Sequence, residues 1–180
     1  MRKGWRRPGL LAGCIFGGLL ATAAAAAQTA TWKTYSYAAD GFSILFPATP
    51  EVSRKGISTA AGAVELHSYM AEGDSAALYI GVCDYGSRTN GASIAHLLES
   101  AKKSALDNTS AHLVTEKQIA LGIYPGLEME AENSQIHFTA RIYNVGTTLY
   151  QALVVTPLGQ PYAGATRFLD SFQLIARTAP

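Results

Sequence analysis

The chain has 180 residues, of which 48% are hydrophobic and 15% are charged, and its formal net charge is +1. This is an ordinary size for one domain with a single sizeable core. Four of the 14 basic residues lie within residues 1–8, so residues 28–180 carry 10 basic and 13 acidic residues, a net charge of −3. Because no basic stripe remains to neutralise phosphates, the composition argues against a nucleic-acid-binding protein.

Residues 1–27 have the three parts of a bacterial-type signal peptide. A basic segment (residues 1–8) is followed by an uncharged segment (residues 9–27) that ends in a run of alanines. Ala25 and Ala27 occupy the −3 and −1 positions if cleavage falls between Ala27 and Gln28, as a signal peptidase requires. The sequence therefore predicts export to the periplasm or beyond, and a mature domain that begins at Gln28.

Three other interpretations of this segment stay open. The uncharged stretch is long enough to span a membrane as an uncleaved anchor, although it is rich in Gly and Ala. Leu11-Ala12-Gly13-Cys14 resembles a lipobox, but most of the apolar segment follows Cys14. Arg6-Arg7 faintly resembles a twin-arginine signal. We expect contact with a membrane only if the N-terminal segment is retained or Cys14 is lipidated.

The mature region contains a single cysteine, Cys83. One cysteine can form neither an internal disulfide nor a structural zinc site. Cys83 lies in a strongly apolar stretch, so we expect it to be a small buried residue of a strand.

The first half of the mature region alternates apolar and polar residues with the period of a β-strand. Strands are predicted over residues 31–37, 42–46, 51–59, 64–71 and 77–85. Ala39-Asp40-Gly41 is a turn signal, because Gly admits a positive φ and Asp bonds its own backbone. In residues 64–71 the alternation places Val64, Leu66 and Met70 on one face, and Glu65, His67 and Tyr69 on the more polar one.

The second half opens with an amphipathic helix, predicted over residues 93–107 and capped by Ser93. Strands are predicted over 112–121, 127–132, 135–145 and 148–156, with a loop over 122–126. A second helix begins at Pro161 and buries Phe168, Leu169 and Phe172. Hairpins favour an antiparallel sheet, and helices must cover one of its faces. The predicted fold is α+β, a twisted and mostly antiparallel β-sheet of about seven strands with two helices packed on it.

Several landmarks occur in a familiar order along residues 35–175. These are YAADGFSILFP at 37–47, the amphipathic helix, Tyr124-Pro125-Gly126, the segments at 141–143 and 149–151, and FLDSF at 168–172. The chain resembles exported bacterial domains of the PsbP-like/DcrB-like α/β class. The resemblance implies a sheet flanked by helices and a role in binding or assembly in the cell envelope, and it supplies no catalytic residue.

Two groups of side chains are candidates for a site. His137, Arg141 and Tyr143 share one face of a predicted strand, with Tyr150 across the hairpin, and arginine with aromatic residues is typical of binding surfaces. His67 and His137, with Glu65, Glu128 or Glu130, would make a metal or hydrolytic site if their strands were neighbours. We find no nucleophile elbow, phosphate loop or cofactor motif. We therefore expect a non-catalytic domain whose partner is an envelope protein or a small ligand, and the enzyme remains the alternative.

Overall fold

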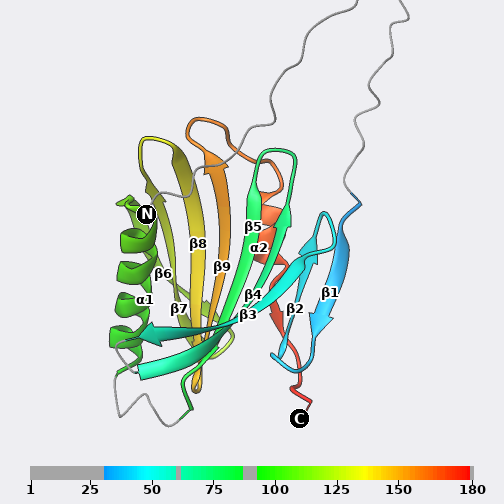
Figure 1. Ribbon diagram of the computed structural model, residues 1–180, viewed down its shortest axis with the longest axis vertical. Helices are drawn as coiled ribbons and strands as arrows, with labels where there is room; N and C mark the ends of the chain where they lie inside the picture. The colour runs from blue at the N-terminus through cyan, green and yellow to red at the C-terminus, as the bar shows by residue number, and fades with distance from the viewer. Residues whose placement is uncertain (1–30, 60–61, 87–92, 179–180) are drawn as a thin grey trace, which may run out of the picture.

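The computed structural model describes residues 31–59, 62–86 and 93–178, which form ten strands and two α-helices (Figure 1). The proposed cleavage residues Ala27 and Gln28, and Cys14, lie outside the described residues. The strands are β1 (Lys33–Tyr37), β2 (Phe42–Phe46), β3 (Glu51–Thr59), β4 (Gly62–Glu72), β5 (Ala77–Asp84), β6 (His112–Leu121), β7 (Tyr124–Glu132), β8 (Ile136–Val145), β9 (Thr148–Pro157) and β10 (Gln173–Leu174). The helices are α1 (Ile94–Thr109) and α2 (Ala165–Asp170).

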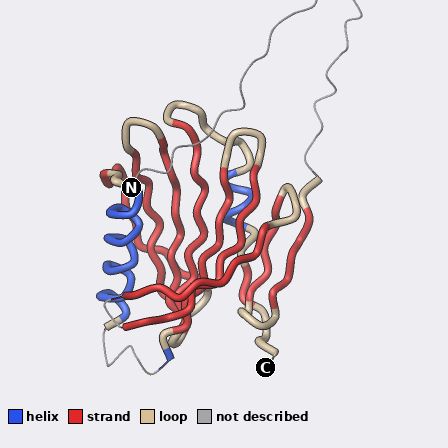
Figure 2. Tube along the Cα trace, viewed as in Figure 1, coloured by secondary structure: helices blue, strands red, loops and turns tan. Residues whose placement is uncertain are grey.

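The strands form two antiparallel sheets. Seven strands make a large sheet in the order β3-β4-β5-β9-β8-β7-β6, and three make a small sheet in the order β1-β2-β10. Helix α1 contacts β7 and β8 on one face of the large sheet, and α2 contacts β2 and β9. Figure 2 shows α1 at one side of the large sheet and the small sheet at the other. The predicted α+β architecture is confirmed, but the first two strands and the last belong to a sheet of their own.

The main core lies between the two sheets. Phe42, Ile44 and Phe46 of β2 are fully buried against Leu78 and Ile80 of β5. The α2 residues Phe168 and Leu169, with Phe172, complete this core, as the sequence predicts. Residues on the other face of the large sheet, such as Phe138 and Ile142, pack beneath α1.

The alternation predicted for β4 is present, and Val64 is buried, but burial in the second half of the strand differs from the prediction. Tyr69 and Ala71 are buried in the main core, whereas Met70 is 43% exposed. The predicted polar face carrying His67 and Tyr69 is covered by the small sheet. Alternation along one strand does not show which of its faces a second sheet will cover, and tyrosine suits a buried site when its hydroxyl has a partner.

Two boundaries in the second half also differ from the prediction. Strand β7 begins at Tyr124, inside the predicted loop, and Pro125 pairs with Ala120 of β6 before the β7–β8 ladder starts at Gly126. Proline is tolerated there because β8 requires no N–H from it. Helix α2 has only six residues and is preceded by Gly164, whose low helix propensity argues against continuing the helix back to Pro161.

Candidate functional site

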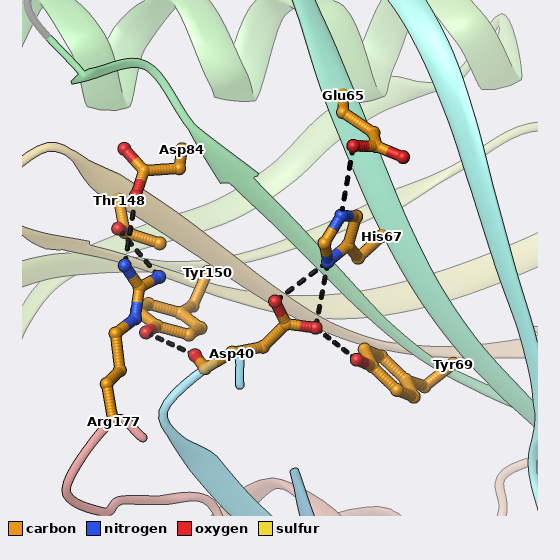
Figure 3. Close-up of polar contacts among 8 residues, drawn as sticks. All are labelled: Asp40, Glu65, His67, Tyr69, Asp84, Thr148, Tyr150 and Arg177. Carbon is orange, nitrogen blue, oxygen red and sulfur yellow. Dashed lines mark hydrogen bonds and ion pairs between the residues drawn. The ribbon is translucent and has the colours of Figure 1, made fainter. Parts of the chain in front are cut away.

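A buried carboxylate links the small sheet to the large one. Asp40 lies in the β1–β2 turn and is 5% exposed. Its carboxylate lies 2.7 and 2.9 Å from His67 Nδ1 and accepts a hydrogen bond from the Tyr69 hydroxyl. The Tyr150 hydroxyl donates to the backbone carbonyl of Asp40 at 2.7 Å (Figure 3). Three side chains from two strands of the large sheet, β4 and β9, thus hold this turn in one position.

The bond to Asp40 fixes the orientation of the His67 ring. Because Nδ1 faces Asp40, Nε2 points the other way and lies 3.5 Å from the Glu65 carboxylate (Figure 3). Burial, together with the hydrogen bond to Asp40, raises the pKa of Tyr69 above the usual phenol range. Tyr69 therefore remains a neutral donor to Asp40 at physiological pH.

A second ion pair joins the C-terminal segment to the same region. Arg177 donates to Asp84 at 2.9 Å and to Thr148 at 3.0 Å. Burial alone would raise the pKa of Asp84, but hydrogen bonds from Arg177, the Gly86 N–H and Thr147 outweigh it and lower that pKa. Gly41 makes room for the arginine: its φ is +73°, and an added Cβ would lie 2.7 Å from Arg177 Cγ.

These side chains surround an open pocket of about 570 Å³, which we call the carboxylate pocket. Three carboxylates (Asp40, Glu65 and Asp84) line it with one guanidinium (Arg177) and His67. Its lining is therefore net negative whether His67 is neutral or protonated. Arg54, the register partner of His67 on β3, is exposed and lies outside this lining. Glu65 is the carboxylate most accessible to a ligand, because its side chain is 59% exposed.

The structure divides the predicted binding residues between two places. His67 lines the carboxylate pocket, and the Tyr150 hydroxyl bonds Asp40 beside it. Tyr143 pairs with Tyr150 across the hairpin, as predicted, but both rings are buried and pack against Phe172.

The other predicted residues lie farther along β8. Arg141 donates from Nε to Glu128 at 2.6 Å and forms an ion pair with Asp170 at 2.7 Å. Its guanidinium is thus paired with a glutamate of the neighbouring strand and with a carboxylate of α2. Strand β7 is an interior strand of the large sheet, because β6 pairs with its other side. His137 lies 4.0 Å from Glu130.

The two histidines of the predicted metal or hydrolytic site do not meet. Strands β5 and β9 lie between β4 and β8, so strand spacing separates His67 from His137 by about 14 Å across the sheet. The register aligns His67 with Tyr143 rather than with His137, which adds about 20 Å along the strand. Within residues 31–59, 62–86 and 93–178, no cluster of three His, Cys, Asp or Glu side chains is suited to a metal ion.

The comparison with solved structures identifies the fold. The solution structure of cyanobacterial PsbP (CyanoP) from Synechocystis sp. PCC 6803 matches with a TM-score of 0.56 and 16% identity, over 91% of this chain and 98% of that one. The fold is PsbP-like. No protein-family model matches the sequence, and no curated protein matches it either. Neither helix of the described part of this PsbP-like domain is long and apolar enough to cross a bilayer.

Sequence reasoning missed most of the carboxylate pocket. Asp40 was interpreted as a turn residue, and Asp84 and Arg177 carried no pattern. Asp40 lies 27 residues from His67, and Asp84 lies 93 residues from Arg177. One signal for the pocket was present in the sequence: Glu65 and His67 are two residues apart in a strand and therefore share one face. Only the packing of the small sheet on the large one shows what that face contacts.

Proposed function

We propose that the protein is an exported, non-catalytic binding domain of the cell envelope, of the PsbP-like/DcrB-like class, and that its carboxylate pocket binds a positively charged amino group of the ligand. The observation that carries this proposal is the excess of carboxylates over cations around an open pocket, with Glu65 accessible at its rim. Charge-assisted hydrogen bonds from an ammonium group to carboxylates are among the stronger polar contacts.

Three features support binding over catalysis at this pocket. The Asp40–His67 pair resembles the carboxylate and histidine that activate a nucleophile in a hydrolase. However, the described lining of the carboxylate pocket includes no serine, threonine or cysteine to act as that nucleophile. Asp40 is committed to His67 and Tyr69, and Asp84 is committed to Arg177. These contacts hold the wall of the pocket, and they leave Glu65 to meet a ligand.

The amino group has two possible sources, a small amine or a lysine side chain of an envelope protein. We would titrate ¹⁵N-labelled protein with cadaverine, and separately with an acetylated peptide containing one lysine. We expect saturable shifts of backbone amides in β4 and β5. Glu65→Gln should weaken binding about 5- to 10-fold, which corresponds to roughly 1 kcal/mol. Tighter binding of the peptide than of cadaverine would indicate a protein partner.

Glu51→Gln is the matched control, because Glu51 is also an exposed strand glutamate and lies five residues from the register partner of Glu65 along β3. It should leave both affinities unchanged. Equal weakening by the two substitutions, or no saturable shifts near Glu65, would contradict the amine-binding proposal.

Export is tested separately by N-terminal sequencing of the protein from fractionated cells. A periplasmic or secreted chain that starts at Gln28 is the expected result. A chain that starts at Met1, or at a lipid-modified Cys14, would contradict cleavage and indicate a tethered domain.

A further inference from the structure

Helix α1 covers only part of one face of the large sheet. It packs on β7 and β8, where Ala105 and Leu106 contact the cluster around Phe138. Beyond it, the same face continues over β9, β5 and β4. Between α1 and these strands lies an open groove of about 730 Å³, which we call the helix groove. Ligand sites in proteins occupy about 300–1,000 Å³, so the helix groove is large enough for a small molecule.

The floor of the helix groove is apolar because of strand alternation. Every second residue of β5 and β9 points into the main core, and the residues between them point into the groove. The larger apolar residues of the floor are Leu66, Tyr79, Cys83, Leu149 and Leu153, and Gln151 is a polar residue among them. Gly81 lies in the middle of this floor, where an added Cβ would lie 3.0 Å from the Tyr79 ring. The glycine therefore lets the Tyr79 ring lie across the floor of the groove.

The middle of the helical wall is built from small residues, between Leu97 and Asn108. Ser100, Ala101, Ser104 and Ala105 line the groove at the i, i+1, i+4 and i+5 positions of α1, so they share one helical face. Larger side chains there would fill the space. On the opposite side, the end of β3 closes the groove with Ile57. Apolar surface thus faces the cavity from the floor and both walls.

The helix groove is unsuited to a charged ligand. Burial raises the pKa of Cys83 to about 11 and also raises the pKa values of Tyr79 and Tyr85, because removal from water destabilises their charged forms. The one acidic side chain in the described lining is Asp107, which is 62% exposed and paired with Lys103. Hydroxyl and amide groups, including those of Ser104 and Gln151, are available for neutral hydrogen bonds.

We propose that the helix groove is a binding site for an uncharged hydrophobic molecule with an alkyl chain, separate from the carboxylate pocket. The volume, the apolar residues of the floor and a described lining whose single acidic side chain is already paired with Lys103 and whose single histidine, His96, is exposed together favour this class over peptides, anions and amines. The chain lies along the Leu66–Leu153 floor, and its polar end reaches the hydroxyl groups of α1. The site is independent of the amine-binding proposal, since the two cavities have no lining residue in common.

The first test uses the purified protein and the neutral fluorescent probe N-phenyl-1-naphthylamine. We expect a saturable rise in fluorescence. Octan-1-ol and decan-1-ol should displace the probe, with affinity rising about threefold to fourfold for each added CH₂ group. Decanoate and decylammonium should displace it at concentrations at least tenfold higher than decan-1-ol. Equal displacement by the charged compounds, or no saturable binding of the probe, would overturn the proposal.

The second test fills the helix groove from its wall. Ser104 is exposed on α1 and lines the groove, so Ser104→Trp should weaken probe binding at least tenfold while the thermal unfolding midpoint stays near the wild-type value. Lys103→Trp is the matched control: Lys103 is adjacent, 72% exposed and outside the lining, and its substitution should change affinity less than twofold. If Ser104→Trp unfolds the protein, Ser100→Trp takes its place. Unchanged binding in a folded groove-filling variant would overturn the proposal.

Discussion

At the residue scale, Glu128 is the clearest case of a carboxylate held by two cations. It lies between Lys117 of β6 and Arg141 of β8, at 2.7 and 2.6 Å, and its side chain is 15% exposed. Burial by itself would raise the pKa of Glu128, but hydrogen bonds from Lys117 and Arg141 outweigh it and lower that pKa. Glu128 therefore stabilises the three neighbouring strands in its ionised form.

We expect Glu128→Gln to reduce the free energy of unfolding by about 1.5–3 kcal/mol at pH 7, the range for hydrogen bonds to charged groups. Because the folded pKa is lowered, this contribution is complete above the unfolded pKa of about 4.3. It is lost as pH falls through the folded pKa. Urea denaturation from pH 7 to pH 2.5 measures the difference between the two proteins. Glu130→Gln, on the same face of β7, is the control and should cost less than about 0.5 kcal/mol. A difference that grows in acid would contradict this account.

At the element scale, β7 and β8 approach closely at Gly126. An added Cβ there would lie 2.6 Å from the backbone carbonyl oxygen of Ile142 and 2.5 Å from the Tyr143 ring. The carbonyl belongs to the ladder and cannot move aside. Gly126→Ala should therefore destabilise the protein by about 1–3 kcal/mol through overpacking. Gly56 of β3 has no atom within 4 Å of such a Cβ, so Gly56→Ala should be neutral or slightly stabilising. Equal thermal midpoints for the two variants would refute the close-approach argument.

The sequence predicted the positions of the strands and helices better than it predicted the candidate site. Apolar periodicity located β2, β5 and α1, and Ser93 caps α1 by accepting from the His96 N–H as predicted. Local pattern did not predict where α2 and β7 begin. The start of α2 depends on the low helix propensity of Gly164. The start of β7 depends on which neighbouring strand needs the backbone N–H that Pro125 lacks. The carboxylate pocket was harder still. Asp40, His67 and Arg177 meet through the packing of two sheets, and no spacing along the chain encodes that packing.

At the scale of the whole molecule, the C-terminal segment holds the small sheet against the large one. After β10, Ile175 N–H donates to the Gly41 carbonyl and Thr178 N–H donates to the Ala38 carbonyl, both in the β1–β2 turn. Arg177 crosses from the same segment to Asp84 of β5. The turn that carries Asp40 is therefore fixed from both sides, by the large sheet and by the C-terminal segment.

We expect a chain that ends at Leu174 to fold but to lose about 2–4 kcal/mol of unfolding free energy, because two backbone hydrogen bonds and the two partly exposed bonds donated by Arg177 disappear. The loss should be local. Elements of low stability open independently of the core, so hydrogen exchange should accelerate in β1 and in the β1–β2 turn, while β5, β9 and β8 keep their protection. Arg177→Lys separates the contributions, because it keeps the backbone bonds and one charge but cannot reach Asp84 and Thr148 with a planar fork. Its exchange rates should fall between those of the wild type and the truncated chain. Uniform acceleration across both sheets would instead mean that the small sheet and the large sheet unfold as one unit.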